Sequence, residues 1–162
     1  MENPSLLVAS LAAGKPLPDT KPGQWNNDSL SGVYHSEHAS SYWSNGQFPS
    51  GFSLTLNMKF APNALSYKGV NDTNPDKLYI NAFEATLDDK PAPIAGNKRY
   101  NEVRIRQLGP REFQVLEQLD GDVIVGQYWV FSDDTKVLMR WGVGKSPENA
   151  SKAFFETFIR KD

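Results

Sequence analysis

A carboxylate between two phenylalanines, close to the C-terminus, is the residue pattern with the clearest chemistry in this sequence. Phe154, Glu156 and Phe158 are spaced two residues apart in the segment Lys152–Arg160, and alternate residues of a strand share one face. A carboxyl group buried among aromatic rings is desolvated, which favours its use as a general acid or base. On an exposed face, Glu156 would be an ordinary cross-strand charge partner.

Two arginines with the same spacing are candidate partners for an anionic or carbonyl group. Arg104 and Arg106 would share one face of a strand, with Val103 and Ile105 on the other. If they face a cavity, their planar guanidinium groups bind carboxylate, phenolate or ketone oxygens and stack on flat rings. If they face solvent, they belong to a solvated outer surface, and the sequence leaves both arrangements open.

Further polar and aromatic residues lie inside apolar strands. Glu117 and Arg140 are ionisable residues in such strands, and Trp141 follows Arg140 directly. Alternation therefore predicts Arg140 outside and Trp141 inside, unless a polar ligand reverses the two faces. Tyr128 and Trp129 are also consecutive, so that one of the two aromatic rings points inward.

The histidines do not form a metal site by spacing. His35 and His38 fall on opposite faces of a strand, and two ligands without a third make a weak site. Asp72, Asn74 and Asp76 are calcium-type ligands, but the glycine and the distal glutamate of a calcium loop are missing. We therefore expect no metal. His35 remains a candidate acid–base group because histidine titrates near neutral pH, with an ordinary surface role as the alternative.

These patterns define a candidate site. We predict catalytic roles for Glu156, His35, Arg104 and Tyr128. The residues that we predict to bind the ligand are Tyr34, Trp43, Phe52, Arg106, Glu117, Trp129, Arg140, Trp141, Phe154 and Phe158.

The elements that would position these residues are short strands. Gly51–Phe60 alternates cleanly between apolar and polar residues, and Ala39–Pro49 reads as an aromatic-rich loop or lid. Glycine, proline and aspartate turns separate the other segments, which is typical of an antiparallel meander. We predict a single all-β domain, an up-and-down antiparallel barrel of about nine or ten strands. Its other strands are Ser31–His38, Leu65–Val70, Leu78–Leu87, a proline-limited Lys90–Ile94, Glu102–Leu108, Glu112–Leu119, Asp122–Phe131, Thr135–Val143 and Lys152–Arg160.

Turn residues in two places resemble those of small bacterial lipocalin-like (calycin-type) barrels. The stretch from Phe83 to Val115 is similar to their Asp-Gly-Lys turn followed by a strand with basic residues, and 132–138 is similar to a later turn of the group. The resemblance covers about 31–161 and implies a lipocalin-like barrel with an internal ligand. Pyocyanin demethylase is a distant member of this group, and its last strand carries a Glu-x-Tyr pair that faces the substrate. The resemblance places this pair at Glu156 and Phe158 of the present sequence. Here Glu156 keeps the carboxylate, whereas Phe158 lacks the phenol.

The N-terminal part differs in composition from the rest. We expect residues 1–27 to be an apolar segment with a proline-rich linker, and the barrel to occupy 28–162. The run Leu6–Ala13 is too short to span a bilayer. A signal peptide would have Lys or Arg before its apolar run, and here neither residue precedes it. We interpret it as an amphipathic helix or an oligomer contact. A cytoplasmic location is favoured, with a secreted or periplasmic one left open.

Composition excludes several classes of function. The net charge of −2 gives no electrostatic footprint for nucleic acid or for insertion into a membrane surface. The absence of cysteine excludes disulfides, thiol catalysis and zinc–thiolate sites. No phosphate loop, dinucleotide fingerprint or nucleophile elbow occurs, so we expect no cofactor. The apolar N-terminal run leaves a homodimer or homotrimer open.

Three functions fit these observations. The one we favour is a cofactor-independent enzyme that acts on a flat, hydrophobic or aromatic small molecule inside the barrel by acid–base chemistry, such as isomerisation, cyclisation or tautomerisation. The second is a non-catalytic binder or carrier of small hydrophobic ligands. The third is a structural or oligomerisation module whose barrel is filled by its own side chains.

Overall fold

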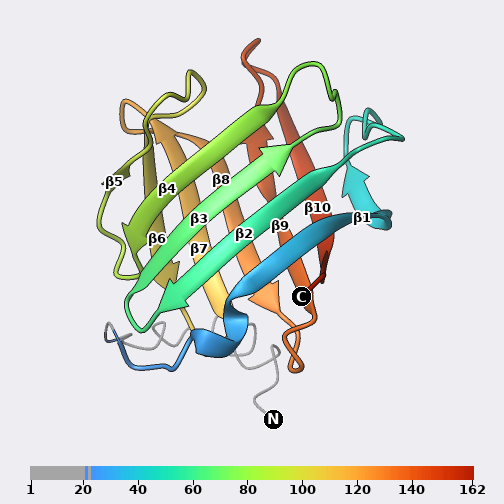
Figure 1. Ribbon diagram of the computed structural model, residues 1–162. Coiled ribbons are helices and arrows are strands. Elements are labelled where there is room, and N and C mark those ends of the chain that lie inside the picture. Colours follow the sequence, from blue (N-terminus) through green and yellow to red (C-terminus); the bar gives the residue numbers. More distant parts are fainter. Residues whose placement is uncertain (1–20, 22) are drawn as a thin grey trace, which may run out of the picture.

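The computed structural model describes residues 21 and 23–162, which form one antiparallel sheet of ten strands (Figure 1). The predicted apolar run and most of the predicted linker lie outside the described residues. No helix in the described part of the chain is long and apolar enough to cross a bilayer. After a short 3-10 helix η1 (Asp28–Leu30), the strands are β1 (Gly32–Trp43), β2 (Leu54–Ala61), β3 (Ala64–Asn71), β4 (Tyr79–Thr86), β5 (Ala92–Pro93), β6 (Glu102–Gln107), β7 (Glu112–Leu119), β8 (Asp122–Phe131), β9 (Val137–Lys145) and β10 (Ser151–Arg160).

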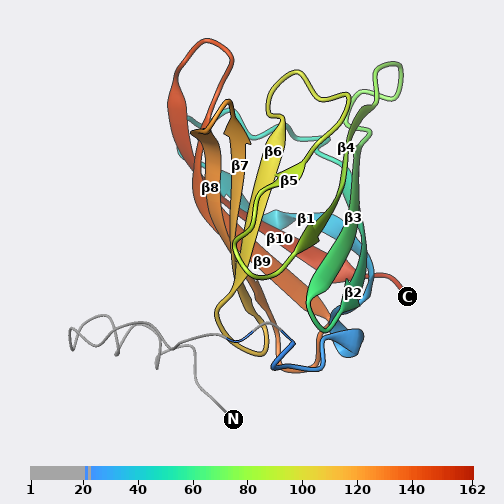
Figure 2. The same cartoon turned by 90° about the vertical axis from the view of Figure 1, so that its left-hand side faces the viewer.

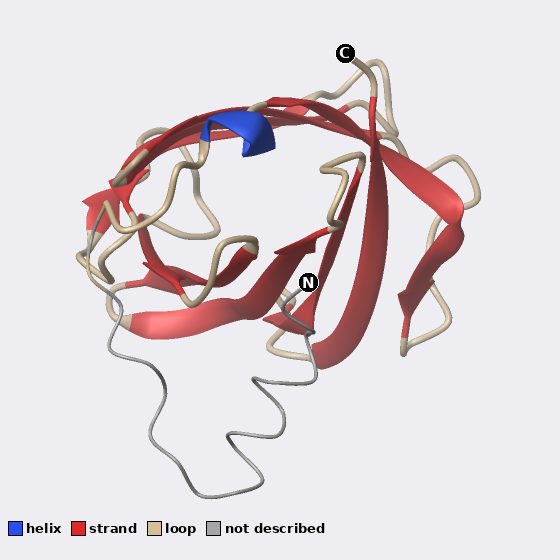
Figure 3. Cartoon of the chain, turned by 90° about the horizontal axis from the view of Figure 1, so that it is seen from below, coloured by secondary structure: helices blue, strands red, loops and turns tan. Residues whose placement is uncertain are grey.

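Strands that are consecutive in the chain are neighbours in the sheet, except β4 and β5, which stand at its two ends. In addition, β1 pairs with β10. The remaining seam lies between β4 and β6, beside the short β5 (Figure 2). Part of this seam is closed by backbone hydrogen bonds from Asp89 N to Ile105 O (2.7 Å) and from Gln107 N to Leu87 O (3.0 Å). Seen from the η1 end, the strands surround one axis (Figure 3). The predicted up-and-down antiparallel barrel of about nine or ten strands is thereby confirmed, with ten strands in the described part of the chain.

The turns explain how short polar segments reverse the chain. Asp120 (φ 50°) and Gly121 (φ 85°) both have positive φ, as a two-residue hairpin turn of type I′ requires. Asp89 (φ 67°) stands in the left-handed conformation, which Asp tolerates better than most residues. In the turn between β8 and β9, Thr135 (φ 59°) adopts this conformation, and Asp134 does not.

The barrel interior is solid at the η1 end. Tyr34, Phe60, Phe113 and Phe131 are buried there and pack edge to face or tilted, with centroid distances such as 5.6 Å for Tyr34 and Phe131. The Tyr34 hydroxyl donates a hydrogen bond to the Leu30 carbonyl (3.0 Å), so its polar end is satisfied. Full burial of each such side chain contributes roughly 1.5–3 kcal/mol. This end therefore anchors the fold and leaves no room for a ligand.

Strand β1 is longer than predicted and includes part of the expected loop. The pairing of β1 with β10 shifts register between Glu37 and Tyr42, which marks a bulge, and continues to Trp43 opposite Phe154. The bulge is held by Ser41, whose hydroxyl donates to Glu37 O (2.7 Å). Consequently Trp43 belongs to the barrel wall.

The two faces of β9 are the reverse of the alternation-based prediction. Leu138 is fully buried, and Arg140 lies on the same inner face, whereas Trp141 (37% exposed) and Val143 (54% exposed) face outward. Further along β9, a Cβ at Gly142 would collide with the backbone of β8, whereas Gly144 lines the interior and leaves space there. On the outer surface, Trp141 joins a row of exposed aromatic residues that lie opposite one another across four strands, namely Tyr128, Trp141, Phe155 and Tyr42.

Candidate functional site

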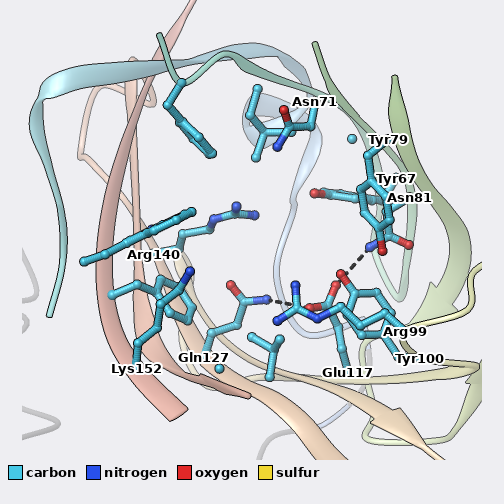
Figure 4. Close-up of a pocket in the computed structure, with 17 residues that line it drawn as sticks. Tyr67, Asn71, Tyr79, Asn81, Arg99, Tyr100, Glu117, Gln127, Arg140 and Lys152 are labelled. Carbon is cyan, nitrogen blue, oxygen red and sulfur yellow. Dashed lines mark hydrogen bonds between the residues drawn. The ribbon is translucent and has the colours of Figure 1, made fainter. Parts of the chain in front are cut away.

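A cavity of about 190 Å³ lies inside the barrel at the end opposite η1 (Figure 4). Its wall combines aromatic rings from Trp43, Phe52 and Phe154 with polar side chains from both halves of the sheet. The polar groups include residues from β4, β7, β8, β9 and β10 and from the loop before β6, namely Asn81, Glu117, Gln127, Arg140, Lys152 and Arg99. Such a mixed wall can orient a small molecule as well as enclose it.

A buried ion pair fixes one side of the cavity. Arg140 Nε donates to Oε2 of Glu156 at 2.7 Å, and Nη2 lies 2.7 Å from the same oxygen in the ion pair. Trp43 Nε1 donates to Oε1 at 2.9 Å. The Arg140 guanidinium also lies over the Phe158 ring, 4.7 Å from its centroid. Burial is the largest single influence and lowers the pKa of Arg140, but Glu156, Tyr67 and Glu117 together outweigh it, so that the pKa of Arg140 is raised. Both oxygens of Glu156 are thus engaged, and its clearest role is to position Arg140.

Glu117 is the carboxyl group that faces the cavity directly. It is 8% exposed, accepts a hydrogen bond from Asn81 Nδ2 at 2.9 Å, and has Gln127 Nε2 at 3.5 Å (Figure 4). Burial raises the pKa of Glu117 to about 6, against the lowering effect of the Arg140 and Arg99 charges. A carboxyl group with such a pKa can both accept and donate a proton near neutral pH.

Two cations of the cavity lack a carboxylate partner. Arg99 Nη2 donates to the Lys145 carbonyl at 2.9 Å, and Lys152 Nζ lies 3.0 Å from the centroid of the Trp43 ring. Neither forms an ion pair within 4.0 Å in the described part of the chain. Burial lowers the pKa of Lys152, and the positive charge of Arg99 adds to this effect.

Tyr67 approaches from the opposite side to Arg140 (Figure 4). Its ring stacks on Phe83 at 4.7 Å, and burial raises the pKa of its hydroxyl to about 12, so Tyr67 stays a neutral donor. A Cβ at Gly69 would lie 2.8 Å from the Tyr67 hydroxyl. Glycine at this position therefore allows the ring to lie along its own strand.

Several predicted residues lie outside the cavity, which corrects their inward assignment. Val103 and Ile105 are fully buried, so alternation turns Arg104 and Arg106 outward, where both bind Asp89 at 2.8 Å.

His35 points away from the cavity, with Nε2 at 3.2 Å from Ser53 Oγ. Tyr128 is 39% exposed because its neighbour Trp129 takes the inward position. Trp141 lies beside Tyr128 on the outer surface, at a centroid distance of 6.2 Å. The structure therefore does not bring the predicted catalytic residues His35, Arg104 and Tyr128 together with Glu156.

The other predicted residues lie in or near the cavity. Trp43, Phe52, Glu117, Arg140 and Phe154 line it. Glu156 and Phe158 contact Arg140 from behind. Trp129 is buried next to the Tyr67 ring, at 5.7 Å, and Tyr34 belongs to the solid end of the barrel.

Sequence reasoning missed the cavity residues Arg99, Lys152, Tyr67, Asn81 and Gln127. Lys152 lies two residues before Phe154 and therefore on the same face of the strand as Phe154 and Glu156. If this face points inward, alternation predicts that Lys152 points inward too. Arg99 precedes β6 in a loop, where alternation gives no signal.

Comparison with known proteins adds little to this description. No protein-family model matches the sequence, and no curated protein matches it. Among solved structures, apocrustacyanin A1 of lobster is similar, with a TM-score of 0.43 and 9% identical residues over 85% of this chain and 63% of that protein. The chain thus spans less than two thirds of the length of apocrustacyanin A1. At this level of similarity, the strand order and pairing of the chain itself define its fold.

Proposed function

We propose that the barrel binds a small organic molecule with a flat ring in the cavity opposite η1. The observation that carries this proposal is the cavity of about 190 Å³, which has an aromatic wall and contains buried polar atoms without partners, Gln127 Oε1 and Arg99 Nε. Buried polar atoms normally have hydrogen-bond partners, and a ligand would supply them here. A cavity of about 150 Å³ suffices for benzene. The space therefore suits one substituted ring and argues against a filled structural module.

A variant that fills the cavity tests this proposal. A Cβ at Gly144 would meet Val125, Arg99 and Phe154 at 3.6–3.9 Å, which is ordinary contact, so Gly144→Leu places a side chain inside without an initial collision. We expect phenol to bind to the wild type, with broadening of its ring proton signals in ligand-observed NMR. Gly144→Leu should abolish the broadening, because leucine occupies the space of the ring.

The matched control is Gly126→Leu. A Cβ at Gly126 meets the side chains of Val123 and Leu116 at 3.5–3.8 Å, so this leucine adds the same volume away from the cavity. It should bind phenol as the wild type does. Equal broadening with Gly144→Leu and Gly126→Leu would contradict binding in the cavity.

Glu117 favours a second candidate function, a cofactor-independent acid–base enzyme acting on such a ligand. An ionised Glu117 would take a proton from a carbon next to a carbonyl group and return it to another atom of the same molecule, which is an isomerisation or tautomerisation. Arg140 and the Tyr67 hydroxyl line the same cavity and would stabilise the oxygen that gains negative charge. In this proposal Glu156, the carboxylate predicted to be catalytic, holds Arg140 in place.

Hydrogen–deuterium exchange tests the chemistry without knowledge of the substrate. In D2O, we expect the wild type to accelerate exchange of the α-protons of 2-indanone, a flat ketone, by at least about 100-fold over buffer. The Glu117→Gln variant should exchange at the buffer rate. Equal acceleration by the wild type and Glu117→Gln, or binding of 2-indanone without any acceleration, would leave binding as the function.

The other expectations from the sequence stay predictions. These are the homodimer or homotrimer, the cytoplasmic location, the boundary between residues 27 and 28, and the kinship with small bacterial barrels that include pyocyanin demethylase. The loss of the family's phenol at Phe158 speaks against demethylation of the same kind.

A further inference from the structure

We propose that the ligand of this cavity is an aromatic carboxylate with a hydroxyl group on its ring, and that Arg99 and Lys152 hold its carboxylate. This inference rests on the proposed binding function and names the class of ligand. Two independent observations lead to it, the charge balance of the cavity and the identity of its unpartnered atoms.

The charge balance favours an anion. Arg140 is neutralised by Glu156 at 2.7 Å, whereas Arg99 and Lys152 have no carboxylate within 4.0 Å in the described part of the chain. The remaining carboxyl group of the wall, Glu117, is hydrogen-bonded to the neutral Asn81 (2.9 Å) and forms no ion pair with Arg99 or Lys152. Even with Glu117 ionised, the cations Arg99, Arg140 and Lys152 outnumber the carboxylates Glu117 and Glu156 by one. Partly buried cations are costly unless a counter-charge is near. A ligand carboxylate would supply that charge.

The unpartnered atoms specify what the ligand must offer. Arg99 Nε is a buried donor without an acceptor, and a carboxylate oxygen accepts from a guanidinium group with good geometry. Gln127 Oε1 is a buried acceptor without a donor, on a side chain that is 3% exposed. A ring hydroxyl would donate to it. A hydrocarbon satisfies neither atom, and a ligand ammonium group would be repelled by Arg99 and Lys152.

The shape of the wall agrees with these polar contacts. Phe52, Trp43 and Phe154 offer apolar surface for a ring, and Gly144 leaves room beside Arg99, since a Cβ there would lie 3.8 Å from Arg99 Nη2. The aromatic face and the cations thus lie in the same cavity, as a ring with a carboxylate substituent requires.

Calorimetric titration at pH 7.5 with phenol, benzoate and 3-hydroxybenzoate tests the inference. A charge-assisted hydrogen bond corresponds to about tenfold or more in affinity. We expect benzoate to bind about tenfold more tightly than phenol, and 3-hydroxybenzoate more tightly than benzoate. Arg99→Gln and Lys152→Gln should each weaken 3-hydroxybenzoate binding about tenfold and weaken phenol binding much less, because phenol carries no carboxylate.

Arg104→Gln is the matched control, because it removes the same charge from the outer surface and should alter no affinity. Binding of phenol as tight as that of benzoate, or equal affinities of Arg99→Gln, Lys152→Gln and Arg104→Gln for 3-hydroxybenzoate, would overturn the anionic ligand but leave the proposed binding function. If none of the compounds binds to the wild type, both proposals fail.

Discussion

Replacing Glu156 with glutamine is expected to lower the free energy of unfolding by about 3–5 kcal/mol, because it leaves the charge of Arg140 buried without a partner. The side chains of Arg140 and Glu156 are only 13% and 6% exposed, so water cannot take the place of the lost carboxylate. Urea unfolding at pH 7.5, followed by tryptophan fluorescence, measures the loss.

Asp89→Asn provides the matched control. It also neutralises a carboxylate that binds arginines at 2.8 Å, but Arg104 and Arg106 are 36% and 45% exposed. Exposed pairs contribute at most about 1 kcal/mol, and asparagine tolerates the left-handed backbone of position 89. A loss in Glu156→Gln no larger than the loss in Asp89→Asn would contradict the structural role of the buried pair.

Replacing Glu117 with glutamine should instead stabilise the barrel at neutral pH. Burial raises the pKa of Glu117 from 4.5 to about 6, so the folded state binds more protons than the unfolded state between these values. The stability of the wild type therefore falls as pH rises from 4.5 to 6, by about 1.4 kcal/mol for each pKa unit of the shift, or about 2 kcal/mol in total. Glutamine cannot ionise, so the variant escapes this loss.

The difference in unfolding free energy between Glu117→Gln and the wild type, measured from pH 4 to pH 8, isolates the effect because the other titrating groups cancel. We expect this difference to increase by about 2 kcal/mol across pH 4.5–6 and then to stay constant. A difference that does not change with pH would contradict the buried, ionising Glu117. A natural sequence that keeps such a destabilising residue is consistent with a functional role.

The barrel was predictable from the sequence because its signals are local. Alternation along segments such as Gly51–Phe60 reports one buried face, and turn pairs such as Asp120-Gly121 mark where the chain reverses. Both signals depend only on residues that are close in the chain, so they can be read without knowledge of which strands pair. The same alternation predicts Phe52 and Phe154 of the cavity wall, whereas Trp43 falls in the segment expected to be a loop or lid.

The polar part of the site was less predictable because it depends on pairing between distant strands. Alternation predicts that Arg140 points outward, yet Glu156 lies opposite it in the register of β9 and β10 and forms an ion pair with it inside the barrel. Arg104 was assigned to the site, but Asp89 holds it outside across the seam of the barrel. Whether a barrel is hollow depends on residues such as Gly144. A side chain at this position would contact Val125, Arg99 and Phe154, which come from other parts of the chain, so the sequence does not show that glycine leaves space here.

The most direct test of a ligand-binding cavity uses the tryptophan indole signals in the 15N–1H spectrum of the protein. Trp43 lines the cavity, and Trp141 lies on the outer surface. During titration with 3-hydroxybenzoate, the indole N–H of Trp43 should shift in a saturable way while that of Trp141 stays in place. A saturable shift of Trp141 with Trp43 unmoved, or no shift of either at saturating ligand, would contradict binding inside the barrel.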